Sequence, residues 1–176
     1  MMKLRLTAAL AIMLLLAGCN GEDVTYSGTI TLDNTLYESG SYYYVLGLSF
    51  EEGIAVPTLP DPNRYDIIVP PGNEAVLSAN TLEPAFALEG EYESESDAKN
   101  AFKALTAVGS VSYIEVASPL KNNQIWVVRT RDRNDNKFRY TKIRTIEVTL
   151  DTTADPDYAS CKLEWVYQPD GSTTFP

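Results

Sequence analysis

The chain has 176 residues, 24 acidic and 14 Lys or Arg, and a formal net charge of −10 at pH 7. Because so acidic a chain is repelled by nucleic acid, we expect no nucleic-acid partner. It contains no histidine, which excludes Ser-His-Asp and Cys-His catalytic units and His-containing zinc sites. We therefore expect a protein that is not an enzyme, with no metal site.

The first residues have the organisation of an export signal. Lys3 and Arg5 precede a mostly apolar run over residues 6–17, and small residues stand just before Cys19. The run is too short for a transmembrane helix, which takes about 20 apolar residues. Residues 16–19 read Leu-Ala-Gly-Cys and resemble the lipobox of bacterial lipoprotein precursors, whose cysteine thiol is acylated before the signal is cleaved.

These features predict the organisation of the whole chain. We expect a lipoprotein signal peptide at residues 1–18, an acylated cysteine and tether at residues 19–24, and a single β-rich domain over residues 25–176. Several acyl chains on Cys19, palmitate among them, would anchor the protein stably. The acidic tether resembles the surface-export signals of Bacteroidetes lipoproteins, which indicates the cell envelope and the outer membrane. The alternative is an ordinary secretory signal with an incidental cysteine.

Beyond the tether, β-branched and aromatic side chains recur with a period of two, between clusters of Gly, Pro, Asn and Asp. This pattern is typical of strands joined by turns. It predicts strands over residues 26–32, 42–50, 65–69, 74–79, 85–92, 111–116, 125–130, 137–150 and 160–167.

The segment 42–50 alternates most clearly, and it begins with three consecutive tyrosines. We predict that these tyrosines are packed into the fold and do not form a site. In an extended strand one face would be better buried than the other. That face would carry Tyr42, Tyr44, Leu46, Leu48 and Phe50.

One segment follows the period of a helix instead. Ser94 or Ser96 is suited to be its N-cap, Glu95 and Asp97 suit its first turn, and Gly109 is suited to be its C-cap. The predicted fold is thus mainly β, with sandwich-like antiparallel sheets and one packed α-helix. The helix would dock through an apolar stripe of Ala98, Ala101, Phe102, Leu105 and Val108.

Seven basic residues fall between positions 129 and 144 of an acidic protein. If residues 125–148 form a hairpin, these cations line one ribbon that could bind carboxylates or phosphates. Pairing with acidic residues on adjacent strands is the alternative that we favour. The candidate ligand-binding residues are Arg129, Arg131, Arg139, Tyr140 and Arg144.

Other reactive-looking patterns have simpler interpretations. The alternating glutamates at residues 89–95 are typical of a solvated face. Residues 132–136 begin like a calcium loop but have Lys137 in the glycine position, so a hairpin turn explains them better. Cys161 alternates with apolar residues and is expected to be a buried structural cysteine.

Three short segments resemble HmuY-type lipoproteins of Bacteroidetes. Residues 48–53 read Leu-Ser-Phe-Glu-Glu-Gly, residues 65–68 read Tyr-Asp-Ile-Ile, and residues 165–172 read Trp-Val-Tyr-Gln-Pro-Asp-Gly-Ser. The resemblance implies a β-rich outer-membrane lipoprotein with some helix, which captures haem and delivers it to a partner transporter.

The haem ligands of that family are histidines or methionines, and here the sequence departs from it. The only methionines, Met1, Met2 and Met13, lie in the predicted signal. Tyrosine or thiolate ligands could replace them, and nothing in the sequence selects among Tyr113, Tyr140 and Cys161. We therefore expect a membrane-anchored, non-enzymatic binding protein for haem or a related small ligand. The alternative is an envelope lipoprotein that binds a protein or glycan without haem.

Overall fold

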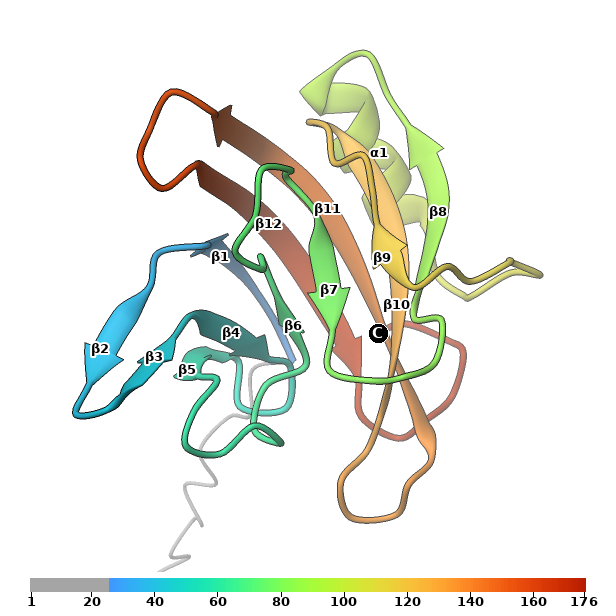
Figure 1. Cartoon of the computed structure of the whole chain (residues 1–176). Coiled ribbons are helices and arrows are strands. Elements are labelled where there is room, and N and C mark those ends of the chain that lie inside the picture. The colour runs from blue at the N-terminus through green and yellow to red at the C-terminus, as the bar shows by residue number, and fades with distance from the viewer. Residues whose placement is uncertain (1–25) are drawn as a thin grey trace, which may run out of the picture.

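The computed structural model describes residues 26–176, so the predicted signal, Cys19 and tether lie outside the described residues. This part of the chain folds into antiparallel sheets with a single helix, which confirms the predicted fold class (Figure 1). One five-stranded sheet contains the longest strands. Its order is β1 (Ser27–Asp33), β12 (Tyr158–Gln168), β11 (Phe138–Asp151), β10 (Gln124–Arg131) and β8 (Phe86–Glu91).

A second five-stranded sheet is built from shorter strands. A separate hairpin pairs β2 (Tyr37–Ser39) with β3 (Tyr42–Tyr44). Within residues 26–176, no helix is both long and apolar enough to cross a membrane. The order of the second sheet is β5 (Ile54–Pro57), β4 (Leu46–Ser49), β6 (Ile67–Ile68), β7 (Leu77–Ala79) and β9 (Val116–Ala117).

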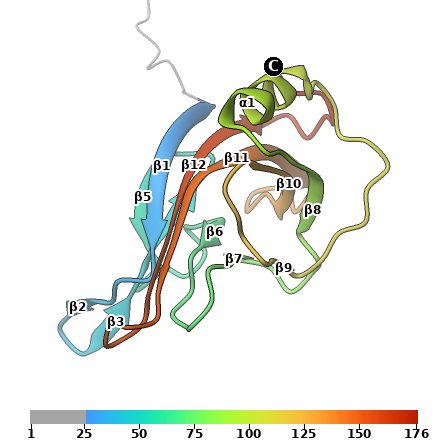
Figure 2. The same ribbon diagram turned by 90° about the horizontal axis from the view of Figure 1, so that it is seen from above.

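The hydrophobic core lies between the two five-stranded sheets. Phe50, which follows β4, stacks on Tyr167 of β12 with ring centroids 6.0 Å apart and also contacts Trp165. The first sheet is strongly curved, as the view from above shows (Figure 2). Cys161 lies in this core with no exposed surface, which confirms the prediction of a buried cysteine. The other fully buried members of the core include Leu48, Ile67, Leu77, Phe86 and Ile143.

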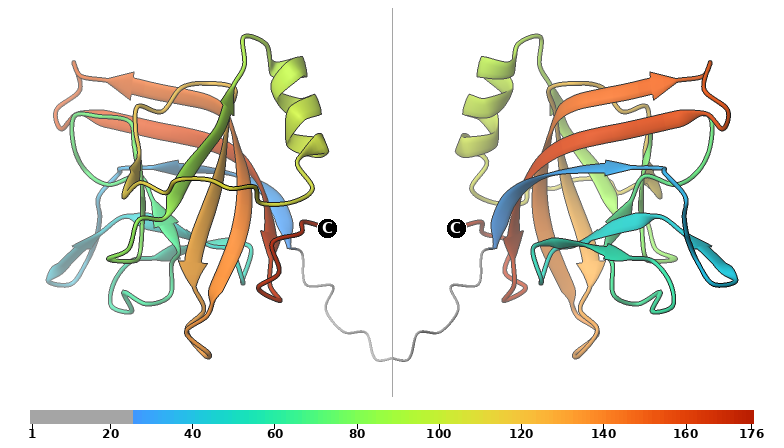
Figure 3. Two further views of the ribbon diagram at one scale, coloured as in Figure 1. Left: turned by 90° about the vertical axis from the view of Figure 1, so that its right-hand side faces the viewer. Right: turned by 90° about the vertical axis from the view of Figure 1, so that its left-hand side faces the viewer.

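The helix α1 (Glu95–Ala104) lies on the outer face of the first sheet (Figure 3). Ser94 is its N-cap, as predicted, because its hydroxyl accepts a hydrogen bond from the N–H of Asp97. The predicted C-cap at Gly109 is wrong, since the helix ends at Ala104. The ammonium group of Lys142, on β11, instead donates to two carbonyls at the helix end, those of Phe102 at 3.0 Å and Leu105 at 2.8 Å.

Four predicted strands are only partly present. The predicted strands 65–69 and 74–79 are reduced to β6 and β7. The segment 42–50 is interrupted at Val45, whose carbonyl accepts from both the N–H and the hydroxyl of Thr58. The predicted strand 111–116 is wrong for most of its length. Only Ile114 in its middle bridges to a strand, through hydrogen bonds with Phe86, because the chain is crossing there from one sheet to the other.

Candidate functional site

The cations of the predicted basic ribbon lie on two different faces of the β10–β11 hairpin. Residues that pair across antiparallel strands share a face. Arg129 pairs with Tyr140, and Arg131 and Arg144 follow on the same, outer face. Arg139 pairs with Thr130 and therefore lies on the core-facing side. The five candidate ligand-binding residues are thus not brought together in one site.

Several of these cations are paired with acids or covered by rings. The guanidinium of Arg131 lies 2.6 Å from Glu83, and Arg144 lies 2.9 Å from Glu164 on the neighbouring strand β12. Arg139, with a side chain only 10% exposed, pairs with Asp135 and Asp132. The Arg129 guanidinium lies 4.0 Å from the centre of the Tyr113 ring, where a cation–π contact holds it.

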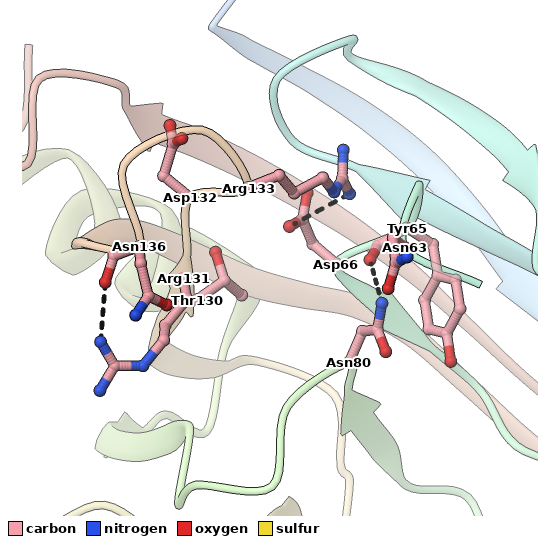
Figure 4. Close-up of a pocket in the computed structure, with 9 residues that line it drawn as sticks. All are labelled: Asn63, Tyr65, Asp66, Asn80, Thr130, Arg131, Asp132, Arg133 and Asn136. Carbon is pink, nitrogen blue, oxygen red and sulfur yellow. Dashed lines mark hydrogen bonds and ion pairs between the residues drawn. The ribbon is translucent and has the colours of Figure 1, made fainter. Parts of the chain in front are cut away.

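A polar pocket of about 440 Å³ lies where the β10–β11 turn faces the loops beside β6 and β7 (Figure 4). Residues 132–136 form this turn, as the hairpin prediction expected, with Asn136 in the left-handed conformation at φ 59°. One wall comes from the turn and from the end of β10, and the other comes from the loops before β6 and after β7. The pocket is lined by Asn63, Tyr65, Asp66, Asn80, Thr130, Arg131, Asp132, Arg133 and Asn136.

Asp66 and Arg133 join the two walls of the polar pocket. One carboxylate oxygen of Asp66 accepts a 2.7 Å hydrogen bond from the N–H of Phe50, and the other lies 3.7 Å from the Arg133 guanidinium. The Asp66 side chain is only 13% exposed. This burial raises the pKa of Asp66 to about 6; the Phe50 N–H and Arg133 oppose the rise, while the nearby Glu51 and Asp132 add to it.

The remaining lining groups differ in how firmly they are bound. Asn80 donates to the carbonyls of Pro62 and Tyr65 and so fixes one wall. Arg131 donates to Glu83 and to the carbonyl of Asn136. Arg133 differs from both, because its contact with Asp66 is longer than a hydrogen bond. Within residues 26–176 its guanidinium makes no hydrogen bond, so its N–H donors are available to a ligand in the pocket that it lines.

A second hollow, which we name the aromatic groove, lies at the opposite end of β11. It has a volume of about 470 Å³ and lies between the β2–β3 hairpin and the β11–β12 turn. The polar pocket adjoins the start of β11, whereas this groove adjoins the turn after its last residue. It is lined by Asn34, Thr35, Leu36, Tyr43, Ala154, Pro156, Asp157 and Tyr158.

The predicted packing of the three tyrosines is wrong at this end of the molecule. Tyr42 and Tyr43 are 61% and 62% exposed. Only Tyr44 is half-buried, stacked on Tyr37 with ring centroids 5.7 Å apart. The hairpin pairs with neither five-stranded sheet, so alternation does not bury one of its faces. The Ser-Gly-Ser run at residues 39–41 was the signal for a tight turn here, with Gly40 at φ 62°.

The three candidate haem ligands do not face either hollow. Cys161 is fully buried, and this burial raises the pKa of its thiol to about 12, so the thiolate that would ligate iron is disfavoured. The Tyr113 hydroxyl is buried and its ring is covered by Arg129. Tyr140 lines neither the polar pocket nor the aromatic groove. Neither hollow therefore brings one of these three residues to a ligand, and haem binding stays a prediction.

Within residues 26–176, no cluster of three or more Asp, Glu or Cys side chains could hold a metal ion. No family model and no curated protein matches the chain. The resemblance to HmuY-type lipoproteins therefore stays a prediction.

Proposed function

We propose that this protein is a lipid-anchored, non-enzymatic binding protein of the bacterial outer membrane, which takes a neutral, hydroxyl-rich ligand such as a saccharide unit in the polar pocket. The observation that supports this proposal is the balanced lining of the pocket. Two carboxylates and two guanidinium groups face it together with three side-chain amides. These charges offset one another and favour no charged ligand.

A sugar hydroxyl both donates and accepts hydrogen bonds, and the lining offers partners for both. Asp66 and the amide oxygens accept, whereas Arg133 and the amide nitrogens of Asn63 and Asn136 donate. The Tyr65 side chain lies along the same wall and adds a ring against which an apolar sugar face can pack (Figure 4). The volume of about 440 Å³ lies within the usual range for small-ligand sites.

The test uses a soluble form with residues 20–176, which includes every described element of the fold. Saturation-transfer NMR with glucose, galactose, mannose and N-acetylglucosamine should show transfer to at least one sugar. Arg133→Gln should weaken that binding about tenfold, because it removes a charged donor worth about 1.5–3 kcal/mol. The matched control is Arg64→Gln, since Arg64 is also paired with a carboxylate, Glu52, but does not line the pocket. Equal losses in both variants would contradict the assignment.

Hemin is the competing small ligand, and it is tested on the same protein. Because Cys161 and the Tyr113 hydroxyl are buried and Tyr140 lines neither hollow, we expect no saturable Soret shift on titration. A saturable shift would replace the saccharide with haem in this proposal.

The anchor is tested separately in cells. Cys19→Ala should abolish labelling by radioactive palmitate, because it removes the only predicted site of acylation. Labelling that persists in Cys19→Ala would refute the lipid anchor and leave the pocket proposal untouched.

A further inference from the structure

The β2–β3 hairpin concentrates exposed apolar surface. Ten large hydrophobic side chains are strongly exposed in residues 26–176, and four of them lie between positions 36 and 44. Contiguous exposed apolar surface on a soluble domain marks an interaction site. The hairpin reads Tyr-Glu-Ser-Gly-Ser-Tyr-Tyr-Tyr, a composition that gives large contact area at low cost in side-chain entropy, as in antibody loops. The four side chains are Leu36, Tyr37, Tyr42 and Tyr43.

The aromatic groove beside this hairpin has a fixed floor. Asn34, only 7% exposed, donates to the carbonyl of Asp157 and accepts from the N–H of Ala159, both at 3.0 Å. These bonds join the end of β1 to the start of β12. The walls above the floor carry Tyr43 and Tyr158. A preformed apolar hollow of this kind accepts an anchor side chain from a protein partner.

A second depression adjoins the aromatic groove. This cavity of about 240 Å³ shares Asn34, Leu36, Pro156 and Asp157 with the aromatic groove and extends to residues 71–73. Leu36 and Pro156 give the boundary between the two depressions its aliphatic surface. Aliphatic walls favour an apolar amino-acid side chain over a sugar, whose hydroxyls would lose their hydrogen bonds against them.

The charge around the aromatic groove has one sign. Neither residues 26–63 nor residues 145–161, which form the hairpin, the groove and their surroundings, contain Lys or Arg. Asp157 lines the groove directly, and Glu38 pairs with Tyr43 across the hairpin and shares its face. A complementary surface must therefore be cationic. The carboxylates of this end are Asp33, Glu38, Asp151, Asp155 and Asp157.

We infer that the aromatic groove docks a basic protein surface, which inserts one apolar side chain between Tyr43 and Tyr158 and places Lys or Arg against the surrounding carboxylates. The groove lies at the far end of β11 from the polar pocket, so the two sites can be occupied together. This docking goes beyond the proposed function and does not depend on a ligand in the polar pocket. A partner at the outer membrane fits the predicted anchor.

Three fluorescent peptides test this inference on the soluble protein with residues 20–176. The first has a central phenylalanine flanked by lysine and arginine, the second has glutamate in place of the cations, and the third has alanine in place of phenylalanine. Fluorescence anisotropy should show saturable binding of the first peptide alone. Raising the salt from about 50 mM to about 500 mM should weaken it severalfold, because exposed charges are then screened.

The hairpin itself provides a matched pair of variants. Tyr42 and Tyr43 are adjacent and almost equally exposed, but their side chains point to opposite faces of β3, and only Tyr43 lines the groove. Tyr43→Ala should weaken the first peptide about tenfold, the loss typical of a hot-spot side chain, and Tyr42→Ala should change it less than about twofold. Equal effects of the two variants, or equal binding of the cationic and acidic peptides, would overturn the inference.

One further outcome would also overturn the inference that the groove docks a basic protein surface. If the neutral glucan laminarin binds and Tyr43→Ala abolishes that binding while no peptide binds, the groove is a glycan platform. The sugar-binding result for the polar pocket uses Arg133→Gln, which is remote from this groove, so the two proposals fail independently.

Discussion

The two ends of strand β11 carry hollows of nearly equal size and opposite construction. The polar pocket at its start is lined by charged and amide side chains, several of which also bond to the surrounding backbone. The aromatic groove at its end has tyrosine walls, one of them strongly exposed, above a floor of buried hydrogen bonds. In the pocket, the side chains that would bind a ligand also stabilise the fold. In the groove, the side chains of the wall would bind a ligand and those of the floor stabilise the fold.

This difference predicts how each end responds to mutation. A side chain that both binds and stabilises cannot be changed without moving stability, whereas an exposed wall can be removed at little cost. Substitutions in the groove floor and in the pocket should therefore change the free energy of unfolding. Substitutions in the groove wall should change binding alone. Variants at Asn34, Asp66 and Tyr43 separate these cases.

The largest effect is expected at the groove floor. Asn34→Ala should lower the free energy of unfolding by about 3 kcal/mol, because it leaves the N–H of Ala159 and the carbonyl of Asp157 without partners in a buried place. Asn80→Ala is the matched control at the other end. Asn80 also donates to two carbonyls but is exposed, so water replaces the lost bonds and the cost should be below about 1 kcal/mol.

Urea unfolding of the two asparagine variants, followed by tryptophan fluorescence, measures the difference. The described chain has Trp126 and Trp165 in its core, so the signal reports on the whole fold. Equal destabilisation by the two variants would remove the distinction between a rigid floor and an exposed wall at these positions.

The second largest effect, at Asp66, is a stabilisation. Asp66→Asn should raise the free energy of unfolding by about 1–2 kcal/mol at about pH 7.5, because it removes a buried charge while the amide oxygen can still accept from Phe50. The same variant should weaken saccharide binding, since Arg133 loses the carboxylate that positions it. A site residue whose replacement stabilises the fold is typical of a functional position.

The pH dependence follows from the raised pKa of Asp66. The folded protein holds this proton up to about pH 6, whereas the unfolded chain releases it near the ordinary value of 3.8. Between these values the folded state binds more protons, so this group's contribution to stability falls as pH rises. The gain from Asp66→Asn should thus be large at about pH 7.5 and small at about pH 4. A gain that is equal at both values would contradict this assignment.

The long strands of this fold could be predicted from the sequence, and the short ones only in part. Strand β12 alternates along its length, whereas β8 and β10 contain short continuous apolar runs. The short strands β6 and β7 lie within predicted strands, but β2 and β5 were not predicted. Strand β9 has two residues, which is too short for any period to appear. The helix end was missed for another reason, because its capping group, Lys142, comes from a distant strand.

The candidate sites were harder to predict because each joins distant parts of the chain. The basic cluster correctly drew attention to residues 129–144, but only the register shows that Arg139 lies on the opposite face from Arg129. Nothing local distinguishes Asp66, which acquires its burial and its raised pKa when the two sheets meet. Alternation placed Tyr42 on the better-buried face of a strand, but it carries no information on whether a neighbouring sheet exists to cover that face, and Tyr42 is 61% exposed.

The smallest effect on stability is expected at the groove wall, and it is the sharpest test of the comparison. Tyr43→Ala should change the free energy of unfolding by less than about 0.5 kcal/mol, because its side chain is 62% exposed. Tyr37→Ala should cost about 1 kcal/mol through the lost stack on Tyr44. A cost for Tyr43→Ala above that for Tyr37→Ala would mean that the wall supports the hairpin. A negligible cost with lost peptide binding would mean that Tyr43 is exposed in order to bind.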